Sequence, residues 1–272
     1  MVQVELAAFT TALICLAVSS AAGVWSALTK PGHAGGLRGT RRAAGLVHWV
    51  ALTASLIAVT LSLVLRAIQT GHGPFSSMYE FSVAFAWGIM LMALIFSRLY
   101  RLRLIGLIGA AGALGLMIFA ANLSSRAAPL MPALQQSLLL STHVGSAVIS
   151  YGALAIGFGA AIAYLFKSPE QPEAEVLDRL SYHCVIIGFF FLTLVIILGA
   201  IWADIAWGRY WNWDPKETAS LVTWLLFAAY LHARLTRGWK GKKAAVLLIA
   251  GFAAVLFTFL GNYIFNSLHA YN

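Results

Sequence analysis

Histidines and tryptophans are the residues of this sequence best able to do chemistry. Four of the nine tryptophans fall within twelve residues, at Trp202, Trp207, Trp211 and Trp213. The segment ends in Asp214-Pro215, which can open a helix. A membrane-interface belt is one interpretation, since Trp favours that zone. Aromatic residues that alternate with Gly, Arg, Asn and Asp favour another interpretation, a flat platform for a large planar apolar ligand.

Two of the seven histidines lie on either side of this segment. His143 belongs to an apolar run before it, and His269 follows the last apolar run. Imidazole is the commonest metal ligand and binds haem iron axially. The spacing therefore predicts a site with two imidazoles, one from each of two helices, with a macrocycle on the tryptophan platform. His48 and His232 lie near the opposite ends of their runs, and an ionisable group inside a membrane is a functional candidate by default.

The elements that position these residues are long apolar runs. The chain has 272 residues, of which 61% are apolar and 10% charged, with a mean hydropathy of +0.84. This composition excludes a disordered chain, a secreted disulfide scaffold and almost any soluble enzyme. It predicts an all-α integral membrane protein with about eight spans, because each run approaches the roughly 20 residues that cross a bilayer. The spans are expected at Leu6–Leu28, Ala44–Ile68, Tyr79–Phe96, Leu104–Leu123, Gln136–Phe166, Tyr182–Ala203, Thr218–Arg234 and Ala244–Phe265.

The net charge of +9 is an orientation signal. Fourteen of the 18 Lys and Arg residues fall in the segments on one side of the expected spans, which the positive-inside rule makes cytoplasmic. Both termini and the tryptophan segment are then non-cytoplasmic, and nucleic-acid binding has no support. The four cations of the outer side are Arg66, Arg126, Arg209 and Lys216.

Cysteine content and domain organisation narrow the chemistry further. Cys15 and Cys184 form no C-x-x-C pair, which argues against a thiol reductase and against a c-type cytochrome. We expect a single polytopic membrane domain over residues 1–272. Glycines at 106, 109, 112 and 115 predict a small-residue face for close helix contact in the fourth span.

The tryptophan segment also resembles a known pattern. Trp207-Gly208-x-x-Trp211-x-Trp213-Asp214-Pro215-Lys216-Glu217-Thr218 is similar to the WWD motif of haem-handling proteins. Its Asp-Pro-Lys-Glu-Thr ending resembles the CcsA/ResC branch, the system II cytochrome c biogenesis proteins of bacteria and plastids. The likeness extends to four further segments, so that it covers about residues 70–272. These segments are Gly71-His72-x-Pro74-x-Ser76-x-x-Tyr79-Glu80, the segment after His143, Tyr230-Leu231-His232-x-Arg234 and Leu268-His269-x-Tyr271.

The resemblance implies a haem-handling subunit of a cytochrome c synthase, or haem lyase, in a bacterial inner membrane or a thylakoid. It would move haem b across the membrane and present it outside for thioether attachment to the CxxCH motif of apocytochrome c. His143 and His269 would be the axial ligands of the external haem, and His232 would bind haem within the membrane. The platform would consist of Trp207, Trp211, Trp213 and Asp214, with Arg209 as the preferred cation for the haem propionates.

The resemblance also implies partners. A separate CcsB/ResB-type membrane subunit would supply the second ligand at His232, with His48 as a weaker alternative, and a thiol-reducing pathway protein would deliver the apocytochrome thiols reduced. Asp214 and Glu217 are expected to be helix caps rather than general bases. Three alternatives stay open: a HemX-like regulator or haem exporter without synthetase activity, a transporter of another hydrophobic molecule, and a b-type cytochrome.

Overall fold

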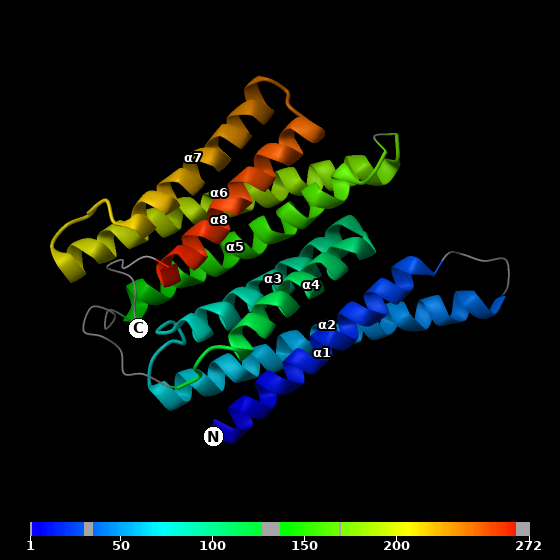
Figure 1. Ribbon diagram of the computed structural model, residues 1–272, viewed down its shortest axis with the longest axis horizontal. Coiled ribbons are helices and arrows are strands. Elements are labelled where there is room, and N and C mark those ends of the chain that lie inside the picture. Colours follow the sequence, from blue (N-terminus) through cyan, green and yellow to red (C-terminus); the bar gives the residue numbers. More distant parts are fainter. Residues whose placement is uncertain (1, 30–34, 127–136, 169, 265–272) are drawn as a thin grey trace. The chain divides into compact units, whose positions relative to one another are not determined.

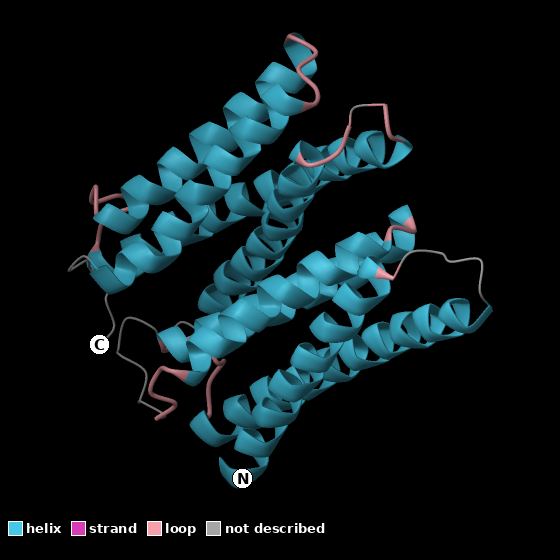
Figure 2. Cartoon of the chain, turned by 45° about the vertical axis from the view of Figure 1, so that its right-hand side comes forward, coloured by secondary structure: helices cyan, strands magenta, loops and turns pink. Residues whose placement is uncertain are grey.

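The computed structural model describes residues 2–29, 35–126, 137–168 and 170–264. This part of the chain is built from helices joined by loops and contains no strand (Figure 2). The all-α prediction is therefore confirmed, with one helix at each expected run. The eight helices are α1 (Val2–Leu28), α2 (Gly35–Thr70), α3 (Met78–Tyr100), α4 (Arg103–Ala121), α5 (Ser137–Leu165), α6 (Pro172–Trp207), α7 (Pro215–Thr236) and α8 (Lys242–Ile264).

Seven of these helices are long and apolar enough to cross a membrane, so the chain is an integral membrane protein. α7 is the helix outside this set, although the sequence predicts a span there. Its 22 residues include Lys216, Glu217 and Arg234 as well as several hydroxyl side chains, which lower its hydropathy. α2 and α6, of 36 residues each, are about 54 Å long at 1.5 Å per residue. Both therefore extend beyond a hydrocarbon core of about 30 Å.

The chain divides into two compact units of four helices each (Figure 1). Unit 1 comprises residues 1–74 and 78–128 and contains α1–α4. Unit 2 comprises residues 75–77 and 129–272 and contains α5–α8. The single membrane domain expected from the sequence stays a prediction, and each unit is described here by itself.

Unit 1 is held by close contact of α1 with α2 and α4, and of α3 with α4. α4 makes a close approach at Gly106, where an added Cβ atom would lie 2.5 Å from the Trp49 ring and 2.6 Å from Nε2 of His48. Only glycine leaves room for these two side chains. The predicted small-residue face is thus confirmed at Gly106, but an added Cβ at Gly115 would meet nothing within 4 Å, so the face does not extend along the whole helix.

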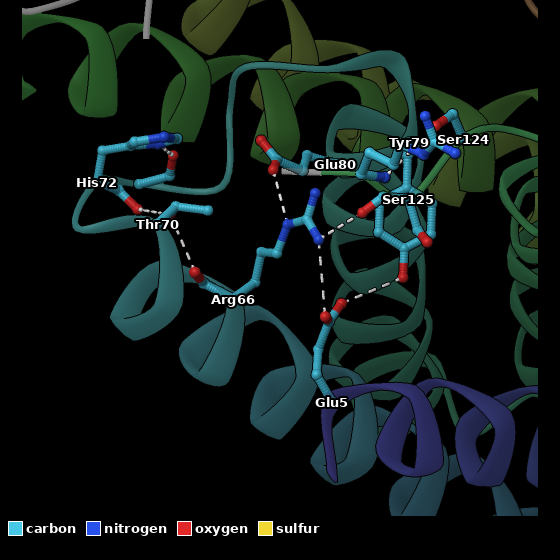
Figure 3. Close-up of polar contacts among 10 residues, drawn as sticks. Glu5, Arg66, Thr70, His72, Tyr79, Glu80, Ser124 and Ser125 are labelled. Atoms are coloured by element: carbon cyan, nitrogen blue, oxygen red, sulfur yellow. Dashed lines mark hydrogen bonds and ion pairs between the residues drawn. The ribbon is translucent and has the colours of Figure 1, made fainter. Parts of the chain in front are cut away.

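A buried ion network joins three helices of unit 1 at Arg66 (Figure 3). The Arg66 Nε donates to Oε1 of Glu80 on α3 at 2.9 Å, and its Nη1 lies 3.6 Å from Oε2 of Glu5 on α1. Nη1 also donates to the backbone carbonyl of Ser125 at 2.7 Å, and Tyr79 donates to Glu5 at 3.4 Å. The three charged side chains are at most 6% exposed, so each depends on the others to offset its lost hydration.

Unit 2 is held by the pairs α5–α6 and α7–α8 and by contacts of α8 with α5. Its core contains Leu154, Leu192, Phe227 and Leu248, all fully buried. At one end of the unit, Arg234 of α7 donates to both carboxylate oxygens of Asp178 at 2.8 and 2.9 Å, and Asp178 also accepts from the backbone N–H of Gly241. This ion pair fixes α6, α7 and the α7–α8 connection together.

Candidate functional site

The tryptophan segment is the end of one helix, a short loop and the start of the next. α6 continues past its expected end at Ala203 to Trp207, so Trp202 and Trp207 are helical. Gly208 ends the helix with φ of 72°, and its N–H donates to the Asp204 carbonyl at 2.8 Å. Such a left-handed cap favours glycine because a side chain there is strained.

The loop is fixed to α7 by a capping box. Asp214 accepts from the backbone N–H of Lys216 at 2.8 Å, while the Glu217 carboxylate accepts from the N–H groups of Asn212 at 2.7 Å and Asp214 at 3.3 Å. Pro215 occupies the first turn, where no N–H is needed. The expectation that both carboxylates act as helix caps is confirmed. Their role is to hold the aromatic loop in one conformation.

The tryptophan rings do not form one flat surface. Trp211 and Trp213 meet edge to face at 85°, and Trp202 and Trp207 at 76°. Trp213 has a φ of 55°, an unusual value for a bulky residue, and its ring centroid lies 5.8 Å from that of Trp211. The two rings of each pair are therefore not coplanar, and the platform for a ligand stays a prediction.

A small pocket with a cavity volume of about 70 Å³ lies beside the loop, within unit 2. Ligand pockets usually begin at roughly 300 Å³, so this cavity has room for one edge of a large ligand. Residues of all four helices of the unit contribute to it. The lining residues are His143, Tyr151, Val195, Ile196, Gly199, Ala200, Trp202, Tyr210, Trp211, Lys216, Glu217, Ser220 and Thr258.

His143 is the side chain of this pocket best able to bind a metal. Its Nδ1 is buried and makes no hydrogen bond of good geometry with the described residues, although the backbone of Val195 lies close to the imidazole. The imidazole packs against Gly199 of α6, where an added Cβ atom would lie 2.9 Å from Cε1. A glycine at this position therefore makes the space for the ring. A buried polar atom without a partner costs free energy, which a ligand at this nitrogen would recover.

Two further polar groups of the pocket could hold an anionic part of a ligand. The indole Nε1 of Trp211 is buried without a partner. Lys216 is half-buried at the start of α7, and burial lowers the pKa of its ammonium to about 8, although nearby Asp214 acts to raise it. An N–H donor and a cation beside one imidazole suit a ligand that carries both a metal and carboxylates.

The other predicted site residues that the structure describes lie outside the pocket lining. Trp207 and Asp214 are held in the α6 end and the capping box, and Trp213 is 70% exposed. Arg209 is exposed in the loop, so that Lys216 is the cation that reaches the pocket. His232 is exposed on α7. His269 lies outside the described residues, and its pairing with His143 stays a prediction.

The sequence reasoning missed several residues that shape the pocket. Tyr151 follows His143 by eight residues, a spacing that keeps two residues near one helix face. Gly199 sits opposite the imidazole. Helical spacing from His143 would have found Tyr151, whereas the approach of Gly199 depends on how α6 packs against α5.

His48, the weaker candidate, is enclosed in unit 1. The side chain is 3% exposed, and its Nδ1 lies 2.9 Å from the hydroxyl of Ser19 and 2.9 Å from the Ser19 carbonyl. Its Nε2 is buried without a partner, but Gly106 packs directly against that nitrogen. A ligand at Nε2 would have to displace the α4 backbone.

The arrangement of helices and loop matches a known family. The family model described as "Cytochrome C assembly protein" matches residues 75–269, which is most of the chain. The chain belongs to this family. The cytochrome c assembly match begins at the loop before α3 and includes the whole of the pocket described above.

Several curated relatives cover most of the chain. The cytochrome c biogenesis protein CcsA of Prochlorococcus marinus is 37% identical, and the alignment covers 99% of this chain and 94% of that protein. The CcsA proteins of Gloeobacter violaceus and Guillardia theta are 35% and 39% identical, covering 83% and 79% of this chain and 87% and 82% of theirs. The resemblance to CcsA-type biogenesis proteins is therefore confirmed, and a role in cytochrome c biogenesis follows.

A solved structure shares the fold. The structure of the cytochrome c haem lyase CcmF aligns with a TM-score of 0.63 at 21% identity, covering 95% of this chain. The chain spans 46% of the length of that protein. At this identity the likeness shows the fold alone.

Proposed function

We propose that this chain presents haem b for covalent attachment to apocytochrome c, as the haem-handling subunit of a cytochrome c synthase. The observation that carries the proposal is His143, which lines a pocket together with Trp202 and Trp211 and has a buried Nδ1 that makes no hydrogen bond of good geometry. Family membership supplies the biological context. Haem, when bound, supplies the two vinyl groups that react with the thiols of a CxxCH motif.

The side chains that line the pocket supply the types of group that bind haem, and the cavity of about 70 Å³ has room for one edge of the macrocycle. His143 would bind the iron, and Gly199 keeps the imidazole free to do so. The Trp211 N–H and the Lys216 ammonium would hold the propionates, and the ring of Trp211 would contact the macrocycle, with the exposed Trp213 ring beside it on the loop. The capping box formed by Asp214 and Glu217 keeps these groups in place, so the contribution of the chain is orientation and ligation rather than proton transfer.

Three parts of the proposal involve residues or proteins beyond this pocket. His269 is the proposed second axial ligand of the same haem. His232, exposed on α7, is the proposed ligand of a haem within the membrane, with a second imidazole from a CcsB/ResB-type subunit. A thiol-reducing pathway protein would keep the apocytochrome cysteines reduced. The pocket and the tryptophan loop would face the non-cytoplasmic side, as the distribution of Lys and Arg indicates.

The test removes the His143 imidazole by mutation and then supplies free imidazole in solution. The full chain is purified with its CcsB-type partner as wild type, His143→Ala and His183→Ala, the last being an exposed histidine outside the pocket. We expect His143→Ala to lose the low-spin absorption spectrum and to regain it with added imidazole, while His183→Ala keeps it. An unchanged low-spin spectrum in His143→Ala would disprove the ligand assignment.

A second readout separates synthesis from binding alone. The same variants are co-expressed with an apocytochrome reporter that carries one CxxCH motif, and covalent haem is measured on the reporter. Wild type should label the reporter and His143→Ala should not. A wild-type complex that binds haem but leaves the reporter unlabelled would favour the HemX-like alternative, a regulator or exporter.

A further inference from the structure

Unit 1 contains a second pocket, distant from its ion network and unrelated to the haem proposal. It lies between α2, the end of α3 and the start of α4, and has a cavity volume of about 320 Å³. Three of its eight lining residues are arginines. The lining consists of Trp49, Thr53, Leu94, Ser97, Arg98, Arg101, Leu102 and Arg103.

The chain brings the three arginines together at a tight connection. Arg98 lies in the last turn of α3, and Arg103 is the first residue of α4. Only Arg101 and Leu102 separate the two helices, and Arg101 has a φ of 53°. This left-handed residue reverses the chain in two residues, at the strain expected for a side chain there, and so keeps three cations within six residues.

No carboxylate of unit 1 can neutralise these arginines. Residues 1–128 contain two acidic residues, Glu5 and Glu80, and both are bound to Arg66. Glu80 lies in the first turn of α3 and Arg98 in its last turn, so about 27 Å of helix separates them. That distance exceeds the Debye length of about 8 Å at physiological salt. The three arginines are exposed to solvent, so an anion that pairs with them would come from outside unit 1.

The remaining lining shows what kind of anion fits. Trp49, Leu94 and Leu102 give the pocket an apolar wall, and Thr53 and Ser97 add hydroxyl groups. The helix ends place the arginines at the end of two membrane spans, which is the depth of lipid headgroups. The start of α4 adds a smaller contribution, because Leu102 provides no side-chain cap for its first N–H groups.

We propose that this pocket binds one anionic phospholipid. The headgroup phosphate lies among Arg98, Arg101 and Arg103, and an acyl chain runs along Trp49 and Leu94. Basic pockets between membrane helices bind anionic headgroups by this chemistry, and the guanidinium fork matches phosphate geometry. Such a lipid would neutralise the α3–α4 connection and hold α2, α3 and α4 together at this end of unit 1.

The experiment measures lipid binding to the intact chain. The full-length protein is purified in a neutral detergent and titrated with phosphatidylglycerol or phosphatidylcholine, and bound lipid is counted by native mass spectrometry. Wild type should bind one phosphatidylglycerol well ahead of phosphatidylcholine. In Arg98→Gln/Arg101→Gly/Arg103→Gln we expect the phosphatidylglycerol affinity to fall roughly 100-fold, at about fivefold for each cation.

The matched control removes the same charge elsewhere. Arg237→Gln/Lys240→Gln/Lys242→Gln changes three exposed cations around the α7–α8 connection, and its affinity should stay within twofold of wild type. Equal loss in both triple variants would show that net charge alone attracts the lipid and would overturn the proposal. Equal wild-type affinity for the two lipids would overturn it as well.

A single-residue variant and a competition with phosphate complete the experiment. Arg101→Gly alone removes one cation and relieves the left-handed strain, so it should fold at least as well as wild type yet bind phosphatidylglycerol about fivefold less. Inorganic phosphate is added as a competitor. Displacement of the lipid by an equal concentration of phosphate would assign the site to a free anion and contradict the lipid proposal.

Discussion

Two imidazoles in the two units, His48 and His143, each have a buried nitrogen without a partner. The difference lies in what covers that nitrogen. Nε2 of His48 lies against Gly106, with Nδ1 anchored to Ser19, whereas His143 lines a pocket with Trp211 and Lys216. An unpaired nitrogen therefore indicates a ligand site only where there is also space for a ligand.

The same contrast extends to the charged residues. Buried charges of unit 1 meet within the unit, as Arg66 does with Glu5 and Glu80. In the unit 2 pocket, Lys216 has no ion-pair partner among the described residues. We infer that the buried ion network of unit 1 maintains the fold, while the polar groups of the unit 2 pocket await a ligand, and four predictions test this difference.

The largest effect is expected on stability, from Arg66→Met. The change leaves Glu5 and Glu80 buried without their cation, so the free energy of unfolding should fall by about 3–5 kcal/mol. Thermal unfolding in detergent measures it. The matched variant Arg209→Met, at an exposed position, should unfold within about 0.5 kcal/mol of wild type. A small effect at Arg66 would show that the network does not stabilise unit 1.

The second prediction removes each of the two imidazoles in a separate variant, so that each variant is the control for the other. His143→Ala should lower the haem content of the purified complex at least tenfold with little change in thermal stability, because its Nδ1 has no protein partner to lose. His48→Ala should keep the haem but lower stability by about 1–3 kcal/mol, because the Ser19 groups lose their partner. Haem loss in His48→Ala and not in His143→Ala would reverse the comparison.

The third prediction uses three glycines. Gly106→Ala should destabilise the protein by about 1–3 kcal/mol, because the new methyl group overlaps Trp49 and His48. In Gly199→Ala the new methyl group overlaps the His143 imidazole instead, so the haem spectrum should change more than the unfolding temperature. Gly115→Ala, with nothing within 4 Å, should be neutral or slightly stabilising. Identical behaviour of all three variants would contradict the packing described here.

The smallest effect is expected from Lys216 and depends on pH. Its pKa is lowered to about 8, so the ammonium is present below that pH and is lost as the pH rises through it. Haem affinity should therefore fall about two- to fivefold between pH 7 and pH 9, the range of one partly exposed ion pair. Lys216→Arg stays charged and should abolish the dependence. Spectrophotometric titration measures both, and an equal pH dependence in the Arg variant would exclude Lys216 as its origin.

The sequence predicts the helices well because each apolar run must satisfy its backbone polar groups internally in a bilayer. The predicted helix ends were less accurate. α6 was expected to end at Ala203 but continues to Trp207, because Trp and Ala are tolerated both inside a helix and at the membrane interface. The capping box at Asp214 and Glu217 was predictable because it depends on neighbours within four residues.

The sequence determined which chemical groups the chain carries, while the tertiary structure decided which of these groups a ligand can reach. The Trp-rich loop, the type of each histidine and the shortage of acidic residues in residues 1–128 can all be read from the printed letters. The sequence could not distinguish an enclosed His48 from a pocket-lining His143, nor show that Lys216 rather than Arg209 reaches the pocket. These differences arise where helices distant in sequence pack, at Gly106 against His48 and Gly199 against His143, and such contacts have no local sequence pattern.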